Sequence, residues 1–117
     1  MNAEEFVNAL RVHVMRSAVD DAIDTMMNPP GRQRATELTE LSTWARGLAE
    51  ADRSMLRRAL VEVAHGAVFG LLAVLDGARR VDERQPPGEL ELWHEGREGR
   101  TKLNGNLHDI LNSQSWR

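Results

Sequence analysis

Two histidines and an aspartate, His94, His108 and Asp109, form the most enzyme-like set of side chains in this 117-residue chain. Imidazole and carboxylate groups suit proton transfer near neutral pH or a metal site with nitrogen and oxygen ligands. Their spacing matches no two-histidine ligand motif such as HExxH. The pattern therefore favours a structural role, in which His108 or Asp109 caps the loops of a hairpin. A small hydrolase or metal-dependent enzyme that uses all three residues is the alternative.

Other catalytic chemistries find little support in the residue types. The chain has no cysteine, which excludes disulfides, thiolate zinc sites and a cysteine nucleophile. No serine lies in a nucleophile-elbow context, and the glycines after the helices are spaced for turns rather than for a phosphate-binding loop. We therefore expect no metal and no cofactor. Whether the chain is an enzyme stays open, with the pattern favouring a protein that is not.

Acidic side chains form two candidate partner-binding sets. Three aspartates in the first helix oppose the helix dipole near its negative end, although Arg16 lies four residues before one of them. They predict either a solvated face or an acidic patch that meets a basic partner or the chain's own segment 32–34. The second set lies on the edge of a predicted strand. The candidate residues are Asp20, Asp21, Asp24, Glu89, Glu91 and Trp93.

Three helices and a hairpin are expected to position these residues. Asn2 and Glu5 form a box-like start to a helix that runs to about Met27 and ends at the Asn-Pro-Pro-Gly of 28–31. A second helix spans about 37–50. Asp52 is predicted to cap the third, which ends between 77 and 80. Alternation with period two over 89–94 and 100–103 predicts a β-hairpin, and 107–111 a short helix or strand.

The segment 61–76, VEVAHGAVFGLLAVLD, is apolar nearly all the way round and predicts a buried central helix. Small residues at 66, 70, 73 and 77 share one stripe, which another backbone is expected to approach closely. The favoured cover is the first helix or the hairpin of the same chain, and a second copy in a homodimeric scaffold is the alternative. His65 is expected in the core, about 16 Å along the helix from Asp76 and so too distant for a dyad. Asp76 itself should find a partner in Arg79, Arg80 or a loop amide.

These elements define an α+β fold with a central buried third helix, a small antiparallel hairpin and a short C-terminal element. One domain is expected over 1–117, with its helical part at 2–80 and the hairpin and last element at 88–112. The net charge of −3 disfavours nucleic-acid binding. The longest apolar run, 67–75, is short of the roughly 20 residues of a membrane span, so we expect no membrane and a cytoplasmic location.

Several short motifs follow one another in a recognisable order between Leu38 and Asn112. In chain order they are Trp44 with Leu48, Asp52-Arg53, Phe69-Gly70, Val74-Leu75-Asp76-Gly77, Gly88, Leu103-Asn104, and Leu107-His108-Asp109-Ile110 with Asn112. In this order they resemble a family of small, functionally uncharacterised bacterial proteins. Leu111 departs from that pattern, which has an aromatic residue there. The resemblance implies a bacterial single-domain α+β protein, and it carries over no activity and no functional residue.

Together these features predict a non-enzymatic protein-binding module, with an immunity or antitoxin-type inhibitor as its concrete form. Small size, mild acidity and exposed acids suit a protein that masks the basic active site of a partner, because opposite charges steer such partners together. The two acidic sets named above would supply the contacts. The homodimeric scaffold and the small enzyme remain the alternatives.

Overall fold

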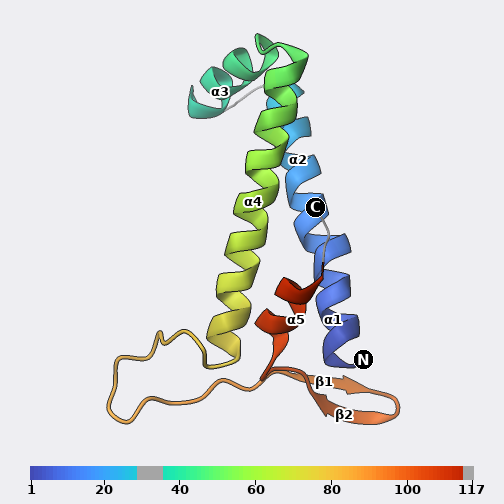
Figure 1. Ribbon diagram of the computed structural model, residues 1–117, viewed down its shortest axis with the longest axis vertical. Helices are drawn as coiled ribbons and strands as arrows, with labels where there is room; N and C mark the ends of the chain where they lie inside the picture. Colours follow the sequence, from blue (N-terminus) through green and yellow to red (C-terminus); the bar gives the residue numbers. More distant parts are fainter. Residues whose placement is uncertain (29–35, 115–117) are drawn as a thin grey trace.

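A long helical hairpin forms the body of the molecule in the computed structural model, which describes residues 1–28 and 36–114 (Figure 1). One arm is a nearly continuous rod of three helical segments, and the other is a single helix of 26 residues. A short helix crosses the far end of the two arms, and another lies between them at the opposite end (Figure 1). The helical elements are α1 (Ala3–Leu10), the π-helical segment η1 (Arg11–Met15), α2 (Arg16–Met27), α3 (Thr36–Arg46), α4 (Glu50–Leu75) and α5 (Leu107–Ser113).

The strands β1 (Trp93–Gly96) and β2 (Gly99–Lys102) form an antiparallel hairpin beneath the arms (Figure 1). Gly96 lies opposite Gly99 at the turn, and Trp93 lies opposite Lys102 at the open end. The predicted α+β class is confirmed. The predicted count of three helices is slightly low, because the π-helical segment divides the first helix and the C-terminal element is helical as well.

Local capping explains where the first arm begins and ends. The Glu5 amide donates to Asn2 Oδ1 at 2.8 Å, and the Glu5 side chain accepts from the Asn2 amide at 3.4 Å, as the sequence predicts. α2 ends at the predicted residue, Met27. Its terminal carbonyl accepts two hydrogen bonds from the Arg46 guanidinium, at 2.9 and 2.8 Å. This arginine therefore fastens α3 to the end of α2.

The bounds of α4 differ from the prediction at both ends. Ala49 is the residue that precedes the helix, so the prediction that Asp52 is the cap was wrong; Asp52 lies in the first turn, where its charge still favours the dipole. The helix ends at Leu75, and Gly77 follows with a φ of +79°. A left-handed glycine there lets the Ala78 amide donate back to the Ala73 carbonyl at 2.8 Å. This turn ends the helix sooner than expected.

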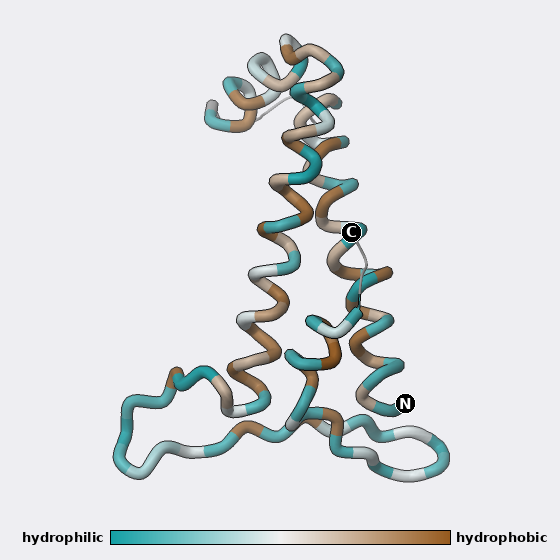
Figure 2. Tube along the Cα trace, viewed as in Figure 1, coloured by the Kyte–Doolittle hydropathy of each residue, from teal (hydrophilic) through white to brown (hydrophobic). Residues whose placement is uncertain are grey.

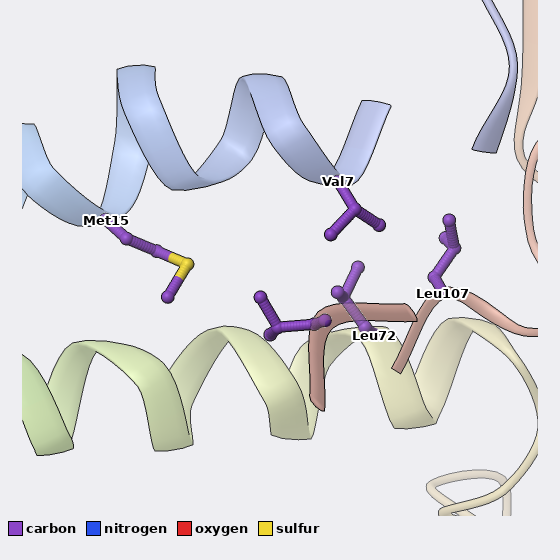
Figure 3. Packing of buried hydrophobic residues seen from close by; sticks show 5 residues of the cluster. Val7, Met15, Leu72 and Leu107 are labelled. Atoms are coloured by element: carbon purple, nitrogen blue, oxygen red, sulfur yellow. The ribbon is translucent and has the colours of Figure 1, made fainter. Parts of the chain in front are cut away.

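The hydrophobic core lies at the end of the hairpin that contains α5 (Figure 3). α1 and η1 contribute Val7 and Met15, which point toward α4 and α5 in Figure 3. Leu72 of α4 meets them, and α5 adds Leu107 and Leu111. All five side chains are at most 1% exposed. Because α5 fills the space between the two arms, it completes a three-sided core that two helices alone would leave open.

The molecule is elongated for its length. Its radius of gyration is 18.1 Å, whereas a compact domain of this size would have a value of about 13 Å. The extents of 49 × 33 × 28 Å follow the two arms. Apolar residues recur along the whole length of α4 (Figure 2). A two-helix hairpin covers only one side of each arm, so α4 is buried along one face and exposed along the other.

Candidate functional site

A buried carboxylate, that of Asp76, joins the end of α4 to the start of α5. Its side chain is fully shielded from solvent and accepts three hydrogen bonds. The backbone amides of Gly105 and His108 donate to it at 2.6 and 2.8 Å, and the His108 ring contacts it through Nδ1 at 2.5 Å. A carboxylate at this place satisfies unpaired amides of a helix N-terminus and interacts favourably with the positive end of the α5 dipole. Asp76 thus caps α5 from another helix.

The environment of Asp76 shifts its acidity in two opposing ways. Burial is the largest single influence and raises the pKa of the carboxyl group. The His108 ring and the backbone amides of His108, Gly105 and Leu107 favour the ionised form, and together they outweigh burial. The pKa of Asp76 therefore lies below its ordinary value. An ionised carboxylate only accepts hydrogen bonds, so the His108 ring carries its proton on Nδ1.

Asn104 makes a second polar connection beside the first. Its side-chain amide donates to the carbonyls of Leu75 and Leu90, at 2.5 and 2.8 Å. Its side-chain oxygen accepts from the Leu92 amide at 2.8 Å. One side chain thereby joins the end of α4 to the segment that leads into β1. The sequence indicated only a turn at 104–106, and Asn104 as a tertiary connector was missed.

The predicted set of His94, His108 and Asp109 is only partly brought together. His108 Nε2 lies 3.5 Å from Asp109 Oδ1. His94 lies on β1 opposite Thr101, and no hydrogen bond or ion pair within 1–28 and 36–114 links it to either residue. Over those same residues, no group of three or more metal-ligating side chains could hold an ion.

The chemistry available to His108 is that of an oriented imidazole. A carboxylate that fixes the Nδ1 proton is the arrangement that positions a general base. In the described part of the chain, however, no serine or threonine hydroxyl is hydrogen-bonded to this ring. Phe69 packs edge-on against it, with ring centroids 5.8 Å apart. The contacts that the structure provides therefore hold α5 in place.

His65 lies in the core, as predicted, and a side-chain amide is one of its partners. Its Nε2 is 3.3 Å from Asn112 Oδ1, and its ring stacks on Phe69 at a centroid distance of 6.4 Å. The predicted partner, a backbone carbonyl or a carboxylate, stays a prediction beside this contact. The loop amides proposed for Asp76 are confirmed, whereas neither Arg79 nor Arg80 bonds its carboxylate.

The acidic side chains of the first helix differ in their surroundings. Asp20 forms an ion pair with Arg57 of α4, at 2.7 Å, and so binds the two arms together. Asp24 accepts from the Asn28 side chain at 3.3 Å. Asp21 is exposed. The segment 32–34, the alternative partner within the chain, lies outside the described residues.

On the hairpin side, Glu91 and Trp93 contact each other and neighbouring cations. The Trp93 indole donates to Glu91 at 3.2 Å, and Lys102 lies 3.9 Å from the same carboxylate. The Arg100 guanidinium lies 4.6 Å from the centroid of the Trp93 ring. Glu89 is exposed before the strand begins. Part of the charge on and beside the hairpin is therefore paired within this region.

An open groove of about 850 Å³ lies between the end of α4 and the loop that follows. Its walls carry both signs of charge, and Asp82 and Arg84 bond to each other at 2.8 Å. The Arg84 side chain and the amides of Gly88 and Arg84 lower the pKa of Asp82 to about 2. The charges therefore organise the loop and give the groove no clear preference for an anion or a cation.

The side of α4 that faces away from the first arm is both apolar and exposed. We call it the α4 outer face; its residues are Met55, Ala59, Val63, Gly66, Ala67 and Leu71. Met55, Val63 and Leu71 are 57%, 68% and 58% exposed. A side chain added at Gly66 would meet nothing within 4 Å. The expectation that the first helix or the hairpin covers the small-residue stripe was therefore wrong at this position.

The C-terminal part of the same stripe is covered by the chain that follows α4. Arg79 folds back so that its Nη1 lies 2.6 Å from the place where a side-chain carbon of Gly70 would be. A side chain at position 70 would therefore have to displace the end of the Arg79 side chain. The guanidinium has no hydrogen bond or ion pair with the described residues. It therefore brings an unpaired positive charge to the end of the outer face.

By length and composition alone, α4 could cross a membrane: an 18-residue window has a mean hydropathy of 1.7. The core helix of a soluble protein passes the same test, so one such helix is weak support for a span. A core helix is mostly buried, however, whereas only 22% of this window is. The nine-residue run measured in the sequence understated how apolar this helix is.

Comparison of the chain with protein-family models, with curated proteins and with solved structures finds no match. The resemblance to a family of small bacterial proteins therefore stays a prediction. Functional inference for this chain rests on its own geometry.

Proposed function

We propose that this chain is a non-enzymatic protein-binding module that binds its partner through the α4 outer face. The supporting observation is the exposure of Val63 and its neighbours along a face of α4 that the rest of the described chain leaves uncovered. Soluble proteins rarely leave a long contiguous apolar patch open unless it is an interaction site. Charged residues border the patch, with Asp52 and Arg53 at one end and Arg79 at the other. An apolar centre with a charged rim is the usual anatomy of a protein interface.

The finer form of this proposal is an inhibitor of the immunity or antitoxin type with a basic partner. Exposed acids such as Asp21 and Glu89 support it, since neither forms an ion pair with the described residues. Asp20 and Glu91 contribute less negative charge to a partner, because Arg57 and Lys102 lie beside them. The dependence of affinity on ionic strength distinguishes the acidic contacts from the apolar ones. Affinity that depends on the acids falls steeply as ionic strength rises, whereas affinity from the outer face changes little.

Site-specific photo-crosslinking tests the proposal. A photoreactive amino acid at position 63 should form covalent adducts with one protein in the cells that make this chain. That protein, once purified, should bind the chain saturably and lose at least about tenfold in affinity to Val63→Glu, which places a charge in the apolar contact.

The matched control places the same photoreactive group at Glu40 of α3, which is exposed and lies off the outer face. Adducts at Glu40 equal to those at 63, or a purified partner that binds Val63→Glu as well as the natural chain, would contradict the proposal. A partner that still binds Val63→Glu but fails with Asp21→Arg would move the binding surface to the acids.

A further inference from the structure

We infer that the partner of the α4 outer face is a second copy of this chain, packed antiparallel about a twofold axis at Val63. The inference rests on the proposed function and adds the identity of the partner. Three observations support it: the extent of the apolar face, the sizes of its side chains and the charges at its two ends.

The outer face has the dimensions of a helix–helix contact. From Met55 to Leu71 it extends about 24 Å, at roughly 1.5 Å per residue. Glu62 is the only acidic or basic residue, histidine apart, between Arg58 and Asp76. A narrow apolar strip of this length fits another apolar helix, and the molecule itself contains one that is left uncovered.

The sizes of the side chains near the axis suit a close antiparallel contact. With the axis at Val63, residues equally far before and after it come to the same level of the two helices. Leu60 then lies level with Gly66 of the other copy, and Ala59 with Ala67. Three small residues of the outer face, Ala59, Gly66 and Ala67, therefore lie within four residues of the axis, which allows the helices to approach closely.

The charges at the two ends of the outer face favour the antiparallel direction. Arg79 lies over Gly70, seven residues after Val63, and its guanidinium is unpaired within the described residues. Asp52 lies eleven residues before Val63, and it too has no ion pair there. In the antiparallel pair the two groups come within about 6 Å of the same level, on the same side of the contact. A parallel pair would place like charges together, which is unfavourable.

Sedimentation velocity gives the first test. The natural chain should sediment as a dimer of twice its 13.2 kDa. Val63→Glu should weaken dimerisation about 100-fold or more, because it buries unpaired charges at the axis. Val81→Glu is a matched control, since Val81 is 64% exposed but lies in the loop, against 68% for Val63. It should leave the dimer unchanged.

A charge swap tests the ion pair. Asp52→Arg and Arg79→Glu should each weaken the dimer several-fold, about the effect of one exposed pair. The double variant restores opposite charges and should return the affinity to within about twofold of the natural chain. Arg97→Glu, on the hairpin turn, serves as the control. A double variant as weak as the product of the two single variants would overturn the pairing.

Cysteine cross-linking tests the direction, because the chain has no cysteine of its own. Val63→Cys should form a disulfide-linked dimer with itself on mild oxidation. Ala59→Cys should cross-link with Ala67→Cys in a mixture but not with itself, since its two copies lie about 12 Å apart along the helices. Self-linking of Ala59→Cys and Ala67→Cys, with none in the mixture, would overturn the antiparallel arrangement.

Two further outcomes would overturn the inference altogether. One is a monomer at every concentration, for the natural chain and Val63→Glu alike. The other is a monomer that binds phosphatidylcholine vesicles through Val63, which would assign the outer face to a lipid surface. A monomer whose position 63 cross-links to a different protein would end this inference and leave the proposed function standing.

Discussion

The two faces of α4 have similar composition and opposite surroundings. On the inner face, Val61, Val68 and Leu72 pack against the core that α1, η1 and α5 complete. On the outer face, Val63 and Leu71 are more than half exposed. A helix that is apolar all round needs cover on two sides, and the described chain provides one. The comparison shows that hydrophobicity alone fixes how much of a helix must be covered, whereas topology decides which part the chain covers itself.

The faces also differ in how their C-terminal ends are held. Beside the inner face, the hydrogen bonds of Asp76 and Asn104 hold α5 and the hairpin segment against the last turn. On the outer face only the Arg79 side chain lies on Gly70, without a hydrogen bond of its own. The first end is a fixed junction. The second places an unpaired cation beside an apolar strip.

Leu72→Ala and Leu71→Ala should separate the two faces most widely. Leu72 is 1% exposed and part of the core, so its truncation should lower the free energy of unfolding by about 2–5 kcal/mol. Leu71 is 58% exposed, and its truncation should change the stability of the single chain by no more than about 0.5 kcal/mol. Urea denaturation followed by circular dichroism measures both.

The two variants are best compared in a Val63→Glu background, where self-association does not add to the measured stability. Equal losses of stability for Leu71→Ala and Leu72→Ala in that background would mean that the same chain covers both faces.

Acid should weaken the junction at the inner face. The folded pKa of Asp76 lies below its ordinary value of 3.8, so its stabilising contribution is complete above that value and is lost as the pH falls through the folded pKa. Unfolding free energy should therefore decrease below about pH 4. Asp76→Asn removes the titrating charge and should cost about 1–3 kcal/mol at neutral pH, while flattening this acid-side decrease.

Asp82→Asn is the matched control for acid sensitivity. The Arg84 side chain and the amides of Gly88 and Arg84 also lower the pKa of Asp82, but this residue lies in the loop and joins no helices together. Its substitution should lower the stability at neutral pH by less than Asp76→Asn does, because solvent screens the exposed Asp82–Arg84 pair. An acid profile of Asp76→Asn that matches that of the natural chain would show that the junction does not depend on this charge.

Features with local causes were predictable from the sequence. The Asn2–Glu5 box, the end of α2 at Met27 and the hairpin with its turn between Gly96 and Gly99 depend on residues close together in the chain. Even the partner of Asp76 was partly foreseen, because a carboxylate at the negative end of a helix needs compensation.

Features that join distant segments were not predictable in the same way. Asn104 bonds to Leu75, 29 residues away, and no periodicity signals such a pair. The sequence pattern of α4 also does not indicate which segment packs on this helix. A small-residue stripe has the same sequence whether its neighbour is the same chain or another copy. The three-dimensional structure is needed to see that no other segment of the described chain packs on Gly66.

The smallest effects should come from single methyl groups on glycines at the outer face and its end. Gly66→Ala adds a side chain that meets nothing within 4 Å in the middle of a helix. In the monomeric Val63→Glu background it should therefore raise the unfolding free energy by up to about 1 kcal/mol, the difference in helix propensity. Gly77→Ala should lower it by about 1 kcal/mol, because φ is +79° there.

In the natural chain the added methyl at Gly66 should weaken dimerisation as it stabilises the helix, since two backbones approach closely at that level. Sedimentation and urea denaturation on the same samples would show the opposite signs, and a gain in both would place the contact elsewhere on α4.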